Sequence, residues 1–211
     1  MAFVMAFASI SYELVIAQVM TSLFGGTVYQ YSLSLGIYML ALGVGSIAMG
    51  DDSKDPLKKF LHVETCLAAM GAVGPIAVLV FETYFFSGAL FAYLWLAILG
   101  FLSGIEIPLL ILLATKHSLQ KDRVEKSVLV WDYAGAFLGC ILFPLITLPL
   151  LGISYGSLFC SIANISMTIL IMLFTQKKSK SLKWASLAFM VSTALIWSVE
   201  DMSSELLKGV Y

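Results

Sequence analysis

Long apolar runs, each about the length of a membrane-spanning helix, follow one another along almost the whole chain. An α-helix needs roughly 20 mostly apolar residues to cross the hydrocarbon core of a bilayer. The pattern therefore predicts an all-α, polytopic membrane bundle over residues 1–199 and a tail over residues 200–211. The segments that we expect to form its transmembrane helices are Ala2–Leu23, Val28–Met49, Phe60–Phe81, Ala89–Thr115, Ser127–Leu150, Ser154–Phe174 and Lys183–Val199.

The seventh segment, Lys183–Val199, is short, and Ser and Thr residues dilute its apolar character. It either crosses the membrane as a seventh helix or lies in the interface, which leaves six spans. The tail lies outside the cell in the first case and inside in the second, so the sequence leaves its side open.

Positive charge is confined to three of the connections between the apolar runs. The loops after the second, fourth and sixth runs carry every Lys and Arg except Lys208. Because Lys and Arg accumulate on the cytoplasmic side of membrane proteins, we expect these loops and the N-terminus to be cytoplasmic, in a bacterial inner membrane. The net charge is −1, so no basic surface invites nucleic acid, and the lipid bilayer is the first expected partner.

A few polar side chains fall inside the apolar runs. An acidic residue at the centre of a bilayer costs roughly 2.5–3.5 kcal/mol on insertion scales, so such residues face the bundle interior and are candidates for function. One interpretation is an acidic cavity formed by the first, third, fourth and fifth helices, which would bind a small cation. The residues that we expect to line it are Glu13, Glu64, Glu106 and Asp132, with the uncharged Gln18 and Gln30.

A purely structural interpretation stays open for Glu64 and Asp132. Both lie in the opening turns of their predicted helices, where unpaired N–H groups favour a carboxylate. Neither the cysteines nor the two histidines are spaced to form a zinc site. We therefore expect no metal, no cofactor and no catalytic residue in this chain.

Small residues recur at the spacing that lets membrane helices approach closely. Gly100 and Gly104 form one GxxxG pair, and Gly135 and Gly139 form another. Such pairs allow close contact between helix backbones. We expect tight packing within the chain, with a homodimer as the alternative.

Several short motifs occur in a characteristic order along the chain. They are Ser11-Tyr12-Glu13-Leu14, Gln30-Tyr31-Ser32, Gly43-Val44-Gly45-Ser46, Val63-Glu64, Gly104-Ile105-Glu106-Ile107-Pro108-Leu109, Asp132-Tyr133-Ala134-Gly135-Ala136, Phe143-Pro144 and Leu148-Pro149-Leu150-Leu151-Gly152. In this order they resemble the membrane-embedded N-terminal region of integral-membrane spermidine synthase-like proteins, in the polyamine aminopropyltransferase family. The resemblance implies that a soluble, Rossmann-like aminopropyltransferase domain usually follows such a region, and the tail resembles the segment that leads into it.

The chain itself contains no glycine-rich nucleotide loop after a strand. From this we expect a non-catalytic membrane module that holds or delivers a small, cationic substrate or anchors a partner protein. One alternative is a half-size transporter that works as a dimer, since residues 45–59 resemble a loop of major facilitator transporters and six helices make half of such a bundle. Another alternative is a structural subunit of a larger membrane complex.

Overall fold

The computed structural model describes residues 1–49, 55–85, 87–116 and 119–175, and this part of the chain is entirely helical. It contains six α-helices and one π-helical turn. In chain order these are α1 (Ala2–Phe24), α2 (Thr27–Met49), α3 (Pro56–Phe85), α4 (Gly88–Thr115), α5 (Lys121–Leu142), η1 (Phe143–Thr147) and α6 (Leu148–Thr175).

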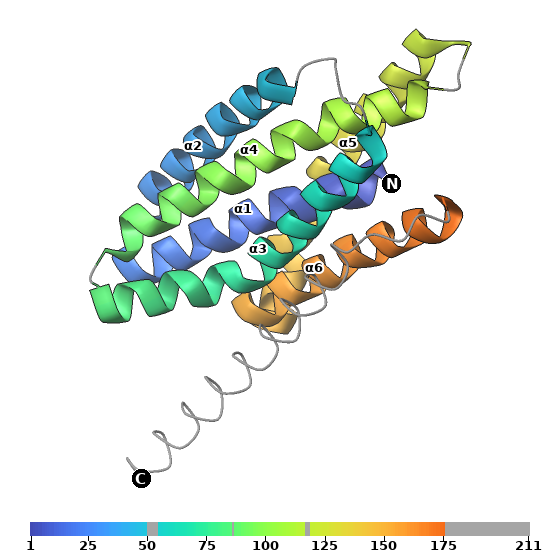
Figure 1. The fold of residues 1–211 in the computed structure, drawn as a ribbon. Helices are drawn as coiled ribbons and strands as arrows, with labels where there is room; N and C mark the ends of the chain where they lie inside the picture. The colour runs from blue at the N-terminus through green and yellow to red at the C-terminus, as the bar shows by residue number, and fades with distance from the viewer. Residues whose placement is uncertain (50–54, 86, 117–118, 176–211) are drawn as a thin grey trace.

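Helix α1 lies at the centre of the bundle, and each of the other five helices packs against it (Figure 1). Its side chains are correspondingly buried: Met20 and Ala17 are fully enclosed, and Tyr12 is almost so. Helix α2 lies at the periphery and packs most extensively against α4. It exposes large apolar side chains such as Val28 and Ile47.

Glycines allow the backbones of two helix pairs to approach closely. A Cβ atom at Gly104 would overlap the carbonyl oxygen of Leu42, so α4 lies directly against α2. A Cβ atom at Gly135 would likewise overlap the carbonyl oxygen of Phe3, where α5 crosses α1. The structure therefore confirms that the predicted small-residue motifs pack within the chain.

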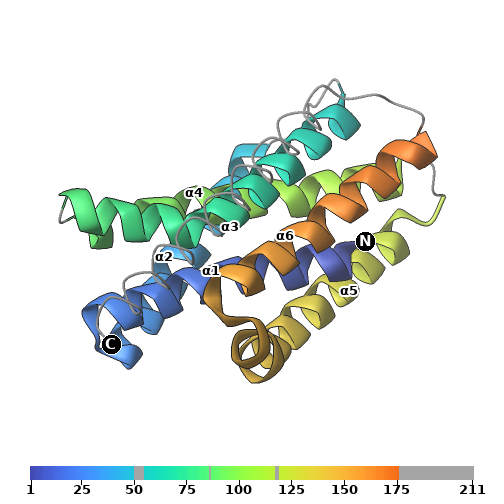
Figure 2. The ribbon, with the colours of Figure 1, turned by 90° about the horizontal axis from the view of Figure 1, so that it is seen from below.

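The segment from α5 to α6 is helical except at one residue, where the chain reverses direction (Figure 2). Pro144 lies in the π-helical turn η1, where the missing N–H of proline interrupts the α-helical hydrogen bonds. The reversal itself occurs at Gly152, whose φ of 71° is a left-handed conformation that glycine adopts readily. The sequence places the break between the fifth and sixth helices at residues 151–153, and the reversal at Gly152 lies within this range.

The described parts of the basic connections lie at one end of the bundle, beside the N-terminus (Figure 1). One cavity at this end is lined by Met1, by Asp55 and Pro56 at the start of α3, by Lys116 after α4, and by Ile171 near the end of α6. The helices therefore cross the bundle back and forth, and the described parts of the first two basic connections lie at the same end, whereas the third connection lies outside the described residues.

The prediction of seven transmembrane helices is not supported. Five helices in the described part of the chain are long and apolar enough to cross a membrane. The fifth is the stretch Lys121–Leu173, counted as one although Gly152 divides it into two helices. The predicted seventh helix, Lys183–Val199, and the tail over residues 200–211 lie outside the described residues. The domain boundary at residue 199 therefore stays a prediction.

Candidate functional site: an acidic cavity between four helices

A cavity of about 300 Å³ lies between α1, α2, α4 and α5 and contains three of the predicted carboxyl groups. They are Glu13 from α1, Glu106 from α4 and Asp132 from α5. Glu13 and Glu106 are only 2% and 4% exposed, whereas Asp132 is less deeply buried. The largely exposed Tyr133 also lines the cavity, so its α5 side reaches the surface of the protein.

A small hydrogen-bonded network of hydroxyl groups forms another part of the cavity wall. The Ser9 hydroxyl on α1 lies 2.6 Å from the Tyr38 hydroxyl on α2 and 2.5 Å from the Ser103 hydroxyl on α4. All three side chains are buried and line the cavity. The network fixes the three helices relative to one another and supplies neutral hydrogen-bonding groups beside the carboxyl groups.

The carboxyl groups of the cavity have no cationic partner in the part of the chain that the structure describes. Among the described residues, no Lys, Arg or His forms an ion pair with Glu13, Glu106 or Asp132. The buried Oε2 of Glu13 has no hydrogen-bond partner in this part of the chain. Burying a carboxylate without a partner is unfavourable, and a positive charge inside the cavity would remove this cost.

Glu64 lies behind this cavity and does not line it. Its side chain on α3 is fully buried, and its carboxyl group interacts electrostatically with that of Glu106. Tyr12 from α1 and Asn164 from α6 also interact with Glu64. The predicted acidic set is thus divided, and α2 takes the place in the cavity wall that the sequence assigns to α3.

The two predicted glutamines do not belong to the acidic cavity. Gln18 accepts a hydrogen bond of 2.6 Å from the Tyr31 hydroxyl, and Gln30 accepts one of 2.7 Å from the Tyr93 hydroxyl. Neither glutamine lines the cavity. The prediction that they do is therefore wrong: they join neighbouring helices through hydrogen bonds.

The sequence contains a signal for the hydroxyl groups, although the predicted site does not include them. Ser9 precedes Glu13 by four residues, and Ser103 precedes Glu106 by three. Residues three or four apart lie on the same face of a helix, so each serine must share the inward-facing side of its glutamate. Tyr12 and Asn164 carry no comparable signal, because their proximity to Glu64 depends on how α1, α3 and α6 pack.

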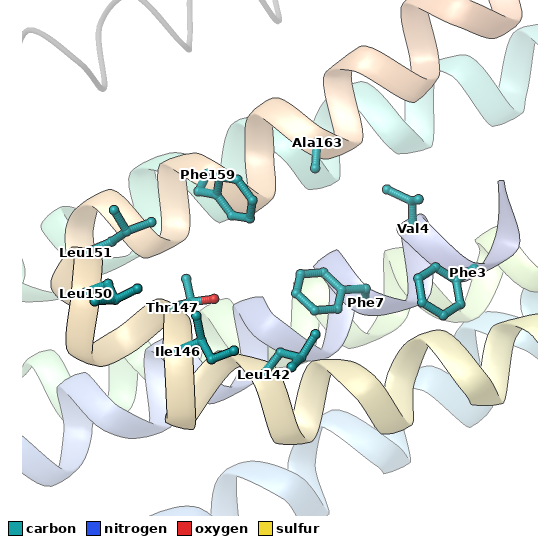
Figure 3. Close-up of a pocket in the computed structure, with 10 residues that line it drawn as sticks. All are labelled: Phe3, Val4, Phe7, Leu142, Ile146, Thr147, Leu150, Leu151, Phe159 and Ala163. Atoms are coloured by element: carbon teal, nitrogen blue, oxygen red, sulfur yellow. The ribbon is translucent and has the colours of Figure 1, made fainter.

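A second, larger cavity of about 450 Å³ has a different character (Figure 3). It lies between α1, the α5–η1 region and α6, with Phe7 and Phe159 facing the same space. Ten residues line it, and Thr147 supplies the only polar side chain among them. Such a wall suits an apolar occupant and offers nothing to balance a charge.

Comparison with known proteins gives an independent indication of function. A protein of Leptospira interrogans is 35% identical over 160 residues, which are 75% of this chain and 32% of the relative. A protein of Corynebacterium efficiens is 32% identical over 169 residues, or 76% of this chain and 32% of the relative. Both are named polyamine aminopropyltransferase. A third relative with this name, from Oceanobacillus iheyensis, is 23% identical over 83% of this chain and 35% of its own length.

These relatives overturn two expectations drawn from the sequence. The chain spans about a third of the length of the curated relatives that it matches. Their shared name is that of an enzyme, so the expectations of a non-catalytic module and of a chain without enzymatic function are wrong. The alternatives, a half-size transporter and a structural subunit, gain no better support from these names. Both expectations rested on the missing nucleotide loop, which does not argue against an enzyme-related role.

No family model matches the chain. No solved structure matches it either, so the suggested likeness to half of a major facilitator bundle is not shown.

Proposed function

We propose that this chain is the membrane-embedded part of a polyamine aminopropyltransferase and that its acidic cavity binds the amine on which the enzyme acts. The relatives' shared name supports the enzyme class and identifies an amine as the relevant chemistry. The observation that carries the assignment of the site is the set of three carboxyl groups, Glu13, Glu106 and Asp132, around one cavity with no cation among the described residues to balance them.

Two features of the surface support the membrane location. The outward face of α2 is apolar, with Val28, Leu40 and Ile47 each more than 70% exposed, and a soluble protein rarely presents such a continuous apolar patch. The described parts of the first two basic connections lie at one end of the bundle. We propose that this end faces the cytoplasm of a bacterial cell, in accordance with the positive-inside tendency.

The chemistry of the cavity fits an ammonium group. A primary alkylammonium group, R–NH₃⁺, has three N–H donors and no acceptor, and it requires oxygen atoms on several sides. Glu13, Glu106 and Asp132 supply carboxylate oxygens from three helices, and the Ser9–Tyr38–Ser103 network supplies hydroxyl oxygens. The volume of about 300 Å³ is at the small end of the range for ligand pockets, as expected for a short linear amine.

Binding of 1,4-diaminobutane to the purified full chain in detergent tests this proposal. Asp132→Asn and Glu106→Gln each remove a charge-assisted hydrogen bond, which contributes about 1.5–3 kcal/mol, so each should weaken binding by roughly tenfold or more. Asp122→Asn and Glu125→Gln are matched controls on the exposed start of α5 and should bind like the unsubstituted chain.

The proposal for the site is refuted if the unsubstituted chain does not bind the diamine, or if both cavity variants bind it with unchanged affinity. Circular dichroism of each variant, which reports helix content, shows whether a loss of binding comes from the site or from unfolding. A homodimer and a partner protein stay predictions, which the mass of the purified particle would test.

A further inference from the structure

The pair formed by Glu64 and Glu106 extends the acidic site into the interior of the bundle. Glu64 is completely buried, and neither of its carboxyl oxygens has a hydrogen-bond partner among the described residues. Glu106 both lines the cavity and interacts electrostatically with Glu64. Glu106 therefore connects a buried carboxyl group, which a ligand cannot reach, with the space that a ligand can enter.

The groups that act on this pair come from the four remaining helices, α1, α2, α5 and α6. Among the described residues, none of these groups is a cation. Two interacting, buried carboxyl groups do not both ionise without a positive charge nearby, because repulsion and desolvation act together. The pair therefore holds at least one proton when the cavity contains no cation. The titratable and polar groups that face it are Tyr12 from α1, Tyr38 from α2, Asp132 from α5 and Asn164 from α6, and Glu13 lines the same cavity as Glu106.

We propose that an amine entering the cavity displaces this proton, so that the site exchanges one ammonium group for one proton. The amine enters as R–NH₃⁺ and keeps all its protons. The O–H bond of the carboxylic acid breaks, its electron pair stays on the carboxylate, and the proton leaves to solvent. At the carboxyl pair one positive charge enters and one leaves, so the net charge of the pair together with its ammonium group is unchanged.

This inference rests on the proposed amine site and adds a pH dependence to it. Release of one proton per bound ammonium makes the affinity rise with pH by up to about tenfold per unit while the pair is protonated. Primary alkyl amines resemble the Lys side chain, which loses its proton near pH 10.4, so between about pH 6 and about pH 8 the proton must come from the protein.

Isothermal titration calorimetry counts the released protons. The full chain is titrated with 1,4-diaminobutane at one pH in phosphate and in HEPES, whose ionisation enthalpies differ, and the difference in heat gives the number of protons. The unsubstituted chain should release about one proton per ligand. In Glu64→Gln, the new amide can donate to the Glu106 carboxylate and hold it ionised in advance, so diamine should bind with little proton release and little dependence on pH.

Two further variants keep the test decisive. Glu64→Asp retains the carboxyl pair and should still release a proton, whereas the exposed Glu125→Gln should behave like the unsubstituted chain. Diamine binding without proton release in the unsubstituted chain overturns the exchange and leaves the proposed amine site intact. Absence of binding overturns the amine site itself. If Glu64→Gln does not fold, the proton count of the unsubstituted chain and its slope with pH still decide the question.

Discussion

Adding a single methyl group at Gly104 should separate α2 and α4, two of the three helices that carry the hydroxyl network. A Cβ atom there would overlap the carbonyl oxygen of Leu42 and lie 2.8 Å from its carbonyl carbon and 2.9 Å from the amide nitrogen of Ser46. All of these are backbone atoms of α2, which cannot rotate away as a side chain can. The only relief is for α2 and α4 to move apart.

The size of this effect follows from comparison with Gly43, which lies on α2 and has open space where a Cβ atom would be placed. Gly43→Ala should be neutral or stabilise the helix by up to about 1 kcal/mol, because alanine has the higher helix propensity. Gly104→Ala has the same propensity gain but should lose about 1–3 kcal/mol through overpacking. We therefore expect Gly104→Ala to be the less stable variant by about 1–3 kcal/mol, the overpacking cost alone.

Unfolding of the purified chain in mixed micelles with an increasing fraction of SDS, followed by circular dichroism, measures this difference. Gly104→Ala should unfold at a lower SDS fraction than Gly43→Ala. Equal midpoints would show that the backbones of α2 and α4 are not in contact, and the description of the α2–α4 interface would then be wrong.

Two other substitutions test features of the fold by the same unfolding assay. Tyr38→Phe removes one of the two hydrogen bonds of Ser9 and should lower the free energy of unfolding by about 0.5–1.5 kcal/mol. Tyr29→Phe is the control and should have no effect, because the Tyr29 side chain is 65% exposed. Equal losses of stability in the two variants would contradict the hydrogen-bonded network. Gly152→Ala should lower the free energy of unfolding by about 1–2 kcal/mol, because the φ of 71° at this position disfavours any residue with a Cβ atom, even though that atom would meet no neighbour. Gly36→Ala, which is also in open space but helical, should not lower it. Equal stability of the two variants would mean that the chain does not reverse at Gly152.

The positions of the helices could be predicted because each apolar run is long and ends at glycine, proline or charged residues. Prediction and structure agree closely for α1, α2 and α4. Helix α3 begins at Pro56, four residues before the predicted start, because proline is well suited to the first turn of a helix, where its missing N–H has no partner to lose. Seven spans are not supported, because the described part of the chain contains five helices that are long and apolar enough to cross a membrane, and the segment over residues 183–199 lies outside that part.

The rotation of each helix about its axis could not be predicted, and the division of the acidic set depends on it. A membrane helix that is apolar on all sides carries no pattern to show which face is buried. Glu64 was therefore expected beside Glu13 and Asp132, but the packing of α3 turns it toward Tyr12 and Asn164. These contacts join residues far apart in the chain, and no local spacing records them.

The glycines that bring the helices together also determine where the carboxyl groups point. On α5, Gly135 follows Asp132 by three residues and therefore lies on the same helix face. Because Gly135 fits against the backbone of Phe3, the side of α5 that carries Asp132 must face α1, which carries Glu13. On α4, Gly104 lies beside Ser103 and two residues before Glu106, so the contact that holds α4 against α2 also sets the depth of Glu106 in the cavity. The acidic cavity is thus a consequence of close helix packing, and a change that loosens either contact should weaken the site even when every carboxyl group remains.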